Sequence, residues 1–287
     1  MNKHESILYL YKSHCIFDHI FDNISYILNN NNIKHIISDI IDDDENKLWL
    51  GIWNDTNKIP KKYIILNTEP LFRDYWNKQI IPVIKNSLFC IDYSFSHIKL
   101  YSQINFFNYK IIPYGYCNNN EIIFQKYKSN TVKDIDILFY GCMLERRRII
   151  FDELQIFAIK NKLNLVVKDN NLYNYNDKCN LISRSKIVLS VAHQENLQTN
   201  DMFRLSFLSS NKIFFITEKL GDKYFEELVE DYFIFFKDVE DLKNKILFFL
   251  NNDEIRQQIS NSIYDFVKRE MNLDTNFPIN DIKKLLV

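Results

Sequence analysis

Short runs of β-branched and aromatic residues alternate with longer amphipathic stretches along almost the whole chain, and this pattern constrains the fold most strongly. In the first half it predicts strands at 6–11, 34–40, 47–53, 63–69, 88–94 and 110–116. In the second half it predicts strands at 135–141, 163–169, 186–193, 212–218 and 232–238. Near-continuous apolar strands separated by helices are typical of parallel sheets covered on both faces. The sequence therefore predicts an α/β protein with two doubly wound, Rossmann-like domains.

A polar segment between the two series of strands, residues 117–133, marks the expected domain boundary. The chain has 287 residues, which is enough for one large or two medium domains. We expect an N-terminal domain at 1–122 and a linker at 123–133. A C-terminal domain at 134–270 and a tail at 271–287 would follow.

The net charge of −1 indicates neither a DNA-binding nor a polyanionic protein, so no nucleic acid is expected as a partner. The five cysteines form no CxxC pair and no histidine stands at metal-ligand spacing, which favours a reduced, intracellular chain without structural zinc. No apolar run approaches the ~18 to 20 residues needed to cross a bilayer, and the start lacks the apolar stretch of a signal peptide. We therefore expect a cytoplasmic protein without a transmembrane segment.

Three consecutive arginines, Arg146 to Arg148, follow the predicted strand 135–141 where a helix begins. The N-terminal end of a helix carries a partial positive charge, so cations there are disfavoured unless an anion binds. Gly141 allows a tight turn, and an arginine after it could bind phosphate oxygens together with free helix N–H groups. Successive helical residues diverge by about 100°, so we expect Arg147 first and Arg146 second at the ligand. Ordinary surface charge is the alternative for all three.

In open α/β sheets, ligands bind outside the carboxyl ends of the strands. Other strand ends of the second half also carry polar side chains: Lys168, His193, Glu195 and Glu218. Asp201 and Arg204 are three residues apart and share one helical face. Asp201 could accept sugar or ribose hydroxyls while Arg204 reaches phosphate, and an intrahelical ion pair is the alternative. The sequence predicts a ligand site where these residues converge.

In the first half, Glu69 in "NTEP" and Asp92 in "IDYS" end predicted strands. Either carboxylate could act as a general base. The alternative for each is a capping role at the start of the following helix.

The order of these segments resembles small GT-B-fold glycosyltransferases of the group 1, family-4-like type found in microbes and large DNA viruses. The likeness covers roughly residues 35–270. In the second half it rests on "DILFYG…RRRIIFDEL", "ISRSKIVLSVAH", "DMFRLSFLSSNKIFFITE" and "KDVEDL". In the first half it rests on "YIILNTEPL", "CIDYSFSHI" and "YKIIPYGY".

The resemblance implies a hexosyltransferase-like enzyme whose two domains face a cleft. The second domain would hold a nucleotide-diphosphate sugar and the first a glycan or other acceptor. No metal or other cofactor is implied, because such enzymes neutralise the diphosphate with basic side chains and a helix N-terminus. Partner glycosyltransferases are possible, and the location would be the host cytoplasm for a viral chain.

By the same resemblance, Arg147 and Lys168 match phosphate-binding positions, and Glu195 and Asp201 lie where acidic contacts to sugar and ribose are expected. Related sequences usually have Glu in place of Asp201, and an E-x7-E spacing is absent because Phe203 stands eight residues after Glu195. The choice between retention and inversion therefore stays open.

Two other functions stay open at this point. One is another reaction on the same fold, such as that of a sugar-nucleotide epimerase or a phosphorylase. The other is a non-catalytic module that binds a glycan or a partner glycosyltransferase. The absence of a GxGxxG loop and of a lysine anchor for pyridoxal phosphate counts against dehydrogenases and phosphorylases.

Overall fold

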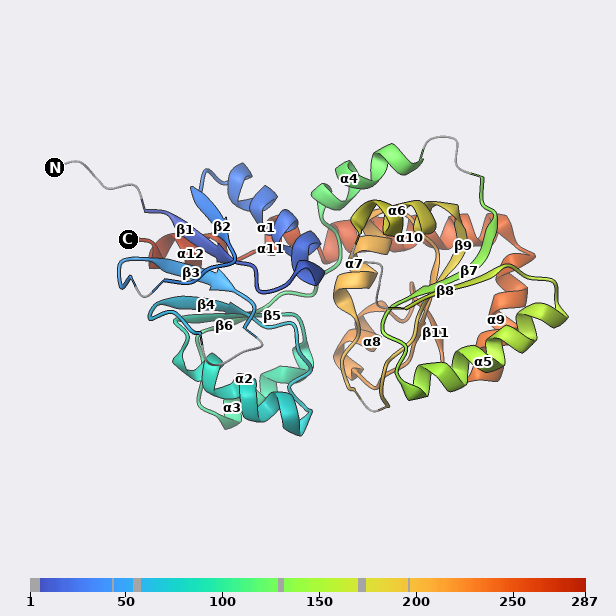
Figure 1. Ribbon diagram of the computed structural model, residues 1–287, viewed down its shortest axis with the longest axis horizontal. Coiled ribbons are helices and arrows are strands. Elements are labelled where there is room, and N and C mark those ends of the chain that lie inside the picture. Colours follow the sequence, from blue (N-terminus) through green and yellow to red (C-terminus); the bar gives the residue numbers. More distant parts are fainter. Residues whose placement is uncertain (1–5, 43, 54–57, 129–131, 170–173, 196) are drawn as a thin grey trace. The chain divides into compact units, whose positions relative to one another are not determined.

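The computed structural model describes residues 6–42, 44–53, 58–128, 132–169, 174–195 and 197–287, which form two compact units (Figure 1). Unit 1 comprises Met1–Pro113 and Leu273–Val287, and unit 2 comprises Tyr114–Asn272. The chain therefore returns to unit 1 after completing unit 2. Figure 1 shows this return in red, where α11 and α12 follow α10.

Unit 1 contains a six-stranded sheet in the order β2-β1-β3-β4-β5-β6, in which all paired neighbours are parallel. Its strands are β1 Leu8–Tyr11, β2 His35–Ser38, β3 Leu48–Gly51, β4 Tyr63–Leu66, β5 Phe89–Asp92 and β6 Tyr109–Ile111. Its helices are η1 Cys15–Phe17, α1 Asp18–Asn30, α2 Asp74–Asn86, η2 Phe95–His97, α3 Ile98–Gln103, α11 Leu273–Asn276 and α12 Ile279–Leu285. Each strand predicted for the first half is present, but the last is shorter than predicted, because β6 ends at Ile111 and not at 116.

Unit 2 contains a five-stranded parallel sheet in the order β11-β10-β9-β7-β8. Its strands are β7 Ile135–Tyr140, β8 Leu165–Lys168, β9 Ser185–Ser190, β10 Phe215–Glu218 and β11 Ile234–Phe236. Its helices are α4 Asn118–Lys128, α5 Glu145–Lys160, α6 Tyr175–Arg184, α7 Met202–Ser210, α8 Lys223–Val229, α9 Val239–Leu250 and α10 Asp253–Glu270. The strand order reverses between β7 and β9, so a ligand crevice is expected at their carboxyl ends.

Burial explains why these strands could be recognised from the sequence. Every residue of β3, β4 and β10 is buried. Helices cover both faces of a parallel sheet, so apolar side chains are needed on both sides of a central strand. The core of unit 2 accordingly combines strand residues such as Ile137, Phe139 and Leu189 with helix residues such as Leu154 and Ile246.

Helix α4 occupies part of the segment that the sequence analysis treated as a polar connection. Its amphipathic pattern is weak, with only Asn120 and Phe124 buried. Phe124 packs edge-on against Phe207 of α7, with ring centroids 5.6 Å apart. This tertiary contact stabilises a helix that the local sequence does not predict. Of the expected linker 123–133, the first six residues lie in α4 and 129–131 lie outside the described residues.

Gly115 gives a test of packing where the chain enters and leaves unit 2. A Cβ added at Gly115 would lie 2.4 Å from the Cβ and 2.6 Å from the carbonyl oxygen of Met271. The same segments are joined by a hydrogen bond from the Tyr116 N–H to the Met271 carbonyl, 2.9 Å long. We expect Gly115→Ala to destabilise the protein by about 1–3 kcal/mol through overpacking, measured by denaturant unfolding.

The matched control is Gly221→Asn. Nothing lies within 4 Å of a Cβ added at Gly221, and its φ of +80° is in the left-handed region that asparagine tolerates. We expect this variant to unfold close to wild type. Equal stability of the Gly115→Ala protein and wild type would show that the two segments are not tightly packed.

Candidate functional site

Parallel strand pairing brings the polar residues predicted in the second half to one edge of the unit 2 sheet. Lys168 and Glu218 are the last residues of β8 and β10, and Gly141 directly follows β7. The Gly141 N–H donates to the Lys168 carbonyl over 3.0 Å, which joins the first two strand ends. These strand-end residues therefore converge at one edge of the sheet.

Arg147 is buried at this edge and ties the start of α5 to the end of β9. Its Nε and Nη2 donate to the Val191 carbonyl over 2.9 and 2.6 Å, and its Nη1 donates to the Cys142 carbonyl over 2.8 Å. The guanidinium lies 5.1 Å from the centre of the Phe139 ring. These bonds use three of its five N–H groups, so Arg147 has a structural role and keeps capacity for a ligand.

Arg146 connects the same helix to the end of β10. Its Nη1 donates to the Ala192 carbonyl over 2.8 Å and to Glu218 Oε2 over 3.1 Å, and its Nη2 also contacts Glu218. Glu218 Oε2 in turn accepts the Ala192 N–H over 2.8 Å. Arg146 and Glu218, each predicted separately as a ligand residue, thus form a two-point ion pair that holds the segment after β9 in place.

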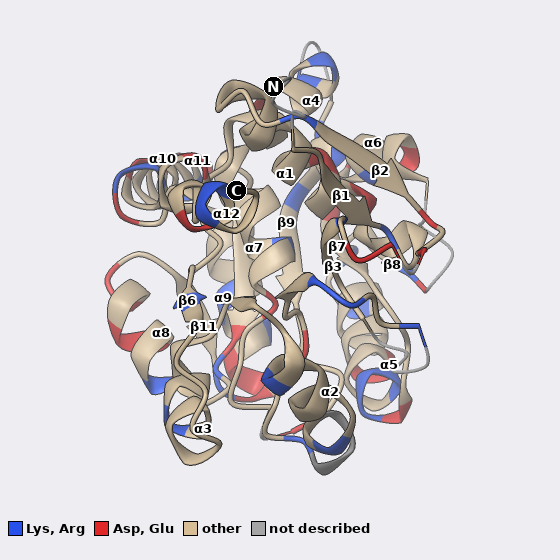
Figure 2. Ribbon diagram, turned by 90° about the vertical axis from the view of Figure 1, so that its left-hand side faces the viewer, with Lys and Arg blue, Asp and Glu red and all other residues tan. Residues whose placement is uncertain are grey.

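Arg148, the arginine that the sequence analysis did not place at the ligand, lies on the exposed surface. Its Nε donates to the Met143 carbonyl over 3.0 Å. It belongs to a helix whose charged residues have both signs, as Figure 2 shows for α5. Of the three arginines, only Arg148 fits the alternative of ordinary surface charge.

Arg204 of α7 is the residue at this edge with the most unused hydrogen-bonding capacity. Its side chain is only 10% exposed, and its Nη2 pairs with Asp201 Oδ2 over 3.2 Å. Its Nε and Nη1 are buried and find no hydrogen-bond partner within the described part of the chain. Leaving a buried donor unpaired costs about 1–3 kcal/mol, and more when it is charged. A bound anion would remove that cost.

Arg147 and Arg204 lie close to each other around Gly141. Arg204 lies 5.5 Å from the centre of the Phe139 ring that Arg147 also covers. A Cβ on Gly141 would come within 3.1 Å of Arg204 Nη2 and 3.4 Å of Arg147 Nη1. Gly141 also has a φ of +146°, which disfavours any other residue. The glycine thus leaves room for both guanidinium groups next to the main chain.

The electrostatics of this pair favour an anion. Burial, and then the charge of Arg204, lower the pKa of Arg147 to about 10. The N-cap residue of α5, Leu144, makes no side-chain hydrogen bond to the first turn of that helix. Arg147 and Arg204 repel each other beside the start of α5, which has no side-chain cap. A diphosphate bound between them would be attracted by both charges and by the helix N-terminus.

Asp201 is the N-cap of α7, and its carboxylate accepts the Arg204 N–H over 3.2 Å. Together with the side-chain contact this is the intrahelical ion pair that the sequence analysis kept as an alternative. The neighbouring Asn200 is 3% exposed, and neither of its amide atoms has a hydrogen-bond partner among the described residues. Sequence reasoning missed Asn200, whose only signal was its place just before a helix.

The remaining predicted residues of unit 2 lie further out. Glu195 is 77% exposed, with its Oε1 3.8 Å from Arg146 Nε, and Lys168 is exposed at the end of β8. His193 is partly buried in the segment after β9. These three residues have the exposure that contact with a bound sugar or nucleotide would need.

In unit 1, Asp92 ends β5 and is completely buried. Its Oδ1 accepts the Ser94 N–H over 2.9 Å, its Oδ2 accepts from Asn67 Nδ2 over 2.9 Å, and Tyr101 and His97 also donate to it. Burial alone would raise the pKa of Asp92, but these interactions outweigh burial and hold the pKa below its ordinary value. Asp92 is therefore a structural carboxylate, close to the capping role that the sequence left open.

Glu69 follows β4 and is only partly buried. Burial raises the pKa of its carboxyl to about 7, against a smaller opposing effect of the Arg73 charge. A carboxyl that titrates near neutral pH suits a general base, which must be ionised before it accepts a proton. Of the two predicted bases, Glu69 has the properties required.

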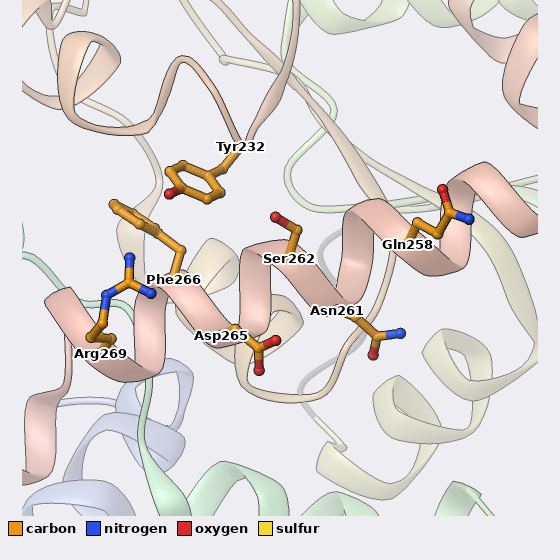
Figure 3. A pocket seen from close by; sticks show the side chains of 7 residues that line it. All are labelled: Tyr232, Gln258, Asn261, Ser262, Asp265, Phe266 and Arg269. Atoms are coloured by element: carbon orange, nitrogen blue, oxygen red, sulfur yellow. The ribbon is translucent and has the colours of Figure 1, made fainter.

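A shallow pocket of about 520 Å³ in unit 2 contains none of these residues (Figure 3). It is lined by Tyr232, Gln258, Asn261, Ser262, Asp265, Phe266 and Arg269. Tyr232 precedes β11, so it lies at the edge where the strands begin, and its ring stacks on Phe266 at 4.1 Å. In the described ranges, no three His, Cys, Asp or Glu side chains group as metal ligands, and no helix is long and apolar enough to cross a membrane.

The chain resembles known proteins both in sequence and in fold. A model of a family described as glycosyl transferase-like matches residues 133–277, just over half of the chain. The chain belongs to this family. The matched segment contains every residue predicted for the candidate site at the edge of the unit 2 sheet.

Two relatives of this family member are proteins of Acanthamoeba polyphaga mimivirus, both described as uncharacterized. Protein L140 is 28% identical over 148 residues, which cover 51% of this chain and 46% of L140. Protein L137 is 31% identical over 141 residues, which cover 48% of this chain and 18% of L137. The matched region is thus less than half of either relative.

Two solved structures share the fold of this glycosyl transferase-like chain. TarM superimposes with a TM-score of 0.54 at 14% identity, over 91% of this chain and 57% of TarM. An α1,3-fucosyltransferase also has a TM-score of 0.54 at 8% identity, over 99% of this chain and 90% of its own. Together with the two parallel sheets, these likenesses confirm the expected GT-B fold class.

Proposed function

We propose that this chain is a glycosyltransferase that moves a sugar from a nucleoside-diphosphate donor to a glycan or other acceptor without a metal ion. The observation that carries the proposal is the buried, incompletely paired guanidinium of Arg204 next to Arg147 and Gly141. Membership of a glycosyl transferase-like family supports the choice of a sugar donor over other phosphorylated ligands.

In this proposal the strand edge of unit 2 binds the donor. Arg204 and the remaining N–H groups of Arg147 donate to the diphosphate oxygens, together with the first turn of α5. These interactions strengthen as the sugar leaves, because the diphosphate then gains negative charge. Glu195, His193 and Asn200 are the proposed contacts to the nucleoside and the sugar.

On the acceptor side, Glu69 is the proposed general base. Its carboxylate takes the proton of an acceptor hydroxyl, whose oxygen forms the new bond to the anomeric carbon. The bond from that carbon to the diphosphate oxygen breaks, and the electron pair leaves with the nucleoside diphosphate. This displacement inverts the configuration of the sugar.

The proposal predicts that nucleoside diphosphates stabilise the protein in the presence of EDTA. Binding to the folded state alone contributes RT ln(1 + [L]/Kd), about 2.7 kcal/mol at a hundredfold excess over Kd. We expect UDP or GDP to raise the melting temperature, and the free nucleosides, which lack the diphosphate, to have little effect. Thermal unfolding at matched ligand concentrations measures both.

Two results would contradict the proposal. One is no shift with any nucleoside diphosphate at millimolar concentration, and the other is a shift that requires Mg²⁺ or Mn²⁺. A panel of nucleotide sugars, assayed for hydrolysis and for transfer, then identifies the reaction. Donor binding without hydrolysis or transfer would support a non-catalytic module, and sugar interconversion without transfer would support an epimerase.

A further inference from the structure

Among the described residues, Glu69 is held through its main-chain groups. The side chain of Asn67 spans the turn after β4, where its Oδ1 accepts the Glu69 N–H over 3.2 Å. Its Nδ2 donates to the Glu69 carbonyl over 3.1 Å. One amide side chain thus fixes both polar main-chain groups of Glu69, in the manner of an Asx turn.

Asn67 is itself fixed from behind by Asp92. The same Nδ2 donates to Asp92 Oδ2 over 2.9 Å, and Asn67 is 2% exposed. Asp92 also receives hydrogen bonds from His97 Nδ1 and from the Tyr101 hydroxyl. Because the buried Asn67 amide must direct its N–H group at Asp92, the amide has one favourable orientation. The Asx turn that the same amide forms is fixed with it.

His97 closes the network at the other end of the same turn. Its Nε2 lies 3.1 Å from the Leu71 nitrogen, whose N–H can only donate. Nε2 must therefore accept, so the proton is on Nδ1 and is donated to Asp92. His97 is completely buried and in contact with the Phe72 and Tyr93 rings. This histidine thus connects the buried Asp92 carboxylate to the main chain of Leu71.

We propose that Asn67, Asp92 and His97 are positioning residues that hold the turn 67–71 so that the Glu69 carboxylate meets the acceptor hydroxyl. The network reaches Glu69 through Asn67 and Leu71 through His97, so it fixes the turn on both sides of the glutamate. None of the hydrogen bonds of this network uses the Glu69 carboxylate, which can therefore meet a substrate. This inference rests on the proposed glycosyl transfer, in which Glu69 is the base.

Asn67→Leu tests the proposal, because leucine has nearly the same size but makes none of the three hydrogen bonds. We expect kcat to fall ten- to a hundredfold while the donor KM, set in unit 2, stays within about twofold. The lower pKa of the kcat–pH profile should also shift to more acidic pH. The freed turn gives the Glu69 carboxyl more water, which favours its charged form.

The pKa of the Glu69 carboxyl can also be measured directly by NMR, without an activity assay. In protein labelled with ¹³C-glutamate, the Glu69 signal is the one lost in Glu69→Gln. It should titrate near the value of about 7 that burial produces in wild type and lower in Asn67→Leu. In the part of the chain that the structure describes, the charged and titratable groups around it are Arg73 before α2 and, behind Asn67, Asp92, His97 and Tyr101. These stay in place in the variant.

Ser87→Ala is the matched control in the same unit. It removes a buried hydrogen bond, from Ser87 Oγ to the Ile84 carbonyl over 2.7 Å, that has no part in the network. Its kcat, pH profile and Glu69 titration should match wild type. Asn67→Ser, which keeps an acceptor for the Glu69 N–H, should have an intermediate effect, and it replaces Asn67→Leu if that variant does not fold.

The two proposals fail in different ways. If wild type transfers sugar and the Asn67 variants keep its kcat and its Glu69 titration, the positioning role is wrong. If wild type transfers no sugar from any donor, the glycosyltransferase proposal is wrong, and the NMR titration still decides whether Asn67 controls Glu69. A lower kcat with an unchanged titration would show a general structural defect and would overturn the positioning role.

Discussion

Arg204→Gln is expected to lower kcat/KM for sugar transfer by about 10² to 10³, which corresponds to roughly 3–4 kcal/mol. The guanidinium is buried, has two nitrogens without partners in the described structure, and lies beside the glycine that follows β7. Glutamine keeps much of the side chain's length but loses the charge that a diphosphate requires. The nucleoside-diphosphate shift in melting temperature should disappear together with the activity.

Two comparisons make this result specific. Arg148→Ala removes a charge from the same edge of the sheet, but its side chain is exposed and bonds only the Met143 carbonyl among the contacts described, so we expect near-normal activity. Arg147 is a poorer test, because its loss would also break three hydrogen bonds to main-chain carbonyls. Full donor binding by well-folded Arg204→Gln would exclude this edge as the diphosphate site.

Asp92→Ala is expected to have the largest effect on stability, about 3–5 kcal/mol, because several buried donors lose their common acceptor and each unpaired donor costs about 1–3 kcal/mol. The variant would leave His97 Nδ1, the Tyr101 hydroxyl, Asn67 Nδ2 and the Ser94 N–H without their acceptor. These donors lie in the core of unit 1, where water cannot replace the carboxylate. Denaturant unfolding followed by circular dichroism measures the loss.

The pH dependence of this effect has a definite sign. Interactions in the folded protein hold the pKa of Asp92 below its ordinary value of 3.8. A depressed folded-state pKa contributes stability that is present above the unfolded pKa and is lost as the pH falls through the folded one. The difference between wild type and Asp92→Ala should therefore be full at pH 7 and shrink below about pH 4. A difference that is constant with pH would mean that the carboxylate charge contributes nothing.

The strands were predictable because burial on both faces of a parallel sheet requires a continuous run of apolar residues in the sequence. A run such as Ile135 to Tyr140 is apolar at nearly every position except Asp136, and β7 covers those residues. The sequence of helix α4 has only a weak amphipathic pattern. Its stability depends on the contact of Phe124 with Phe207, more than eighty residues away, and no local pattern contains that information.

The place of the candidate site was also predictable, since parallel strands must bring their carboxyl ends to one edge. Gly141, Arg146, Arg147 and Glu218 could be named for that reason. What each arginine does could not be read in the same way. Arg147 bonds the Val191 carbonyl and Arg146 pairs with Glu218, and both partners belong to other strand ends.

The sequence by itself determined the two parallel α/β units, the sheet edge at which the predicted ligand residues gather and the residue types available there. These follow from hydrophobic period and chain direction, which are local properties. Only the tertiary structure decided which of those residues are already paired. It directed Arg147 to the main chain, left Arg204 with unpaired nitrogens, and buried Asp92 behind Asn67 and Glu69. Hydrogen-bond pairing depends on distances between segments far apart in the chain, and those distances exist only once the chain has folded.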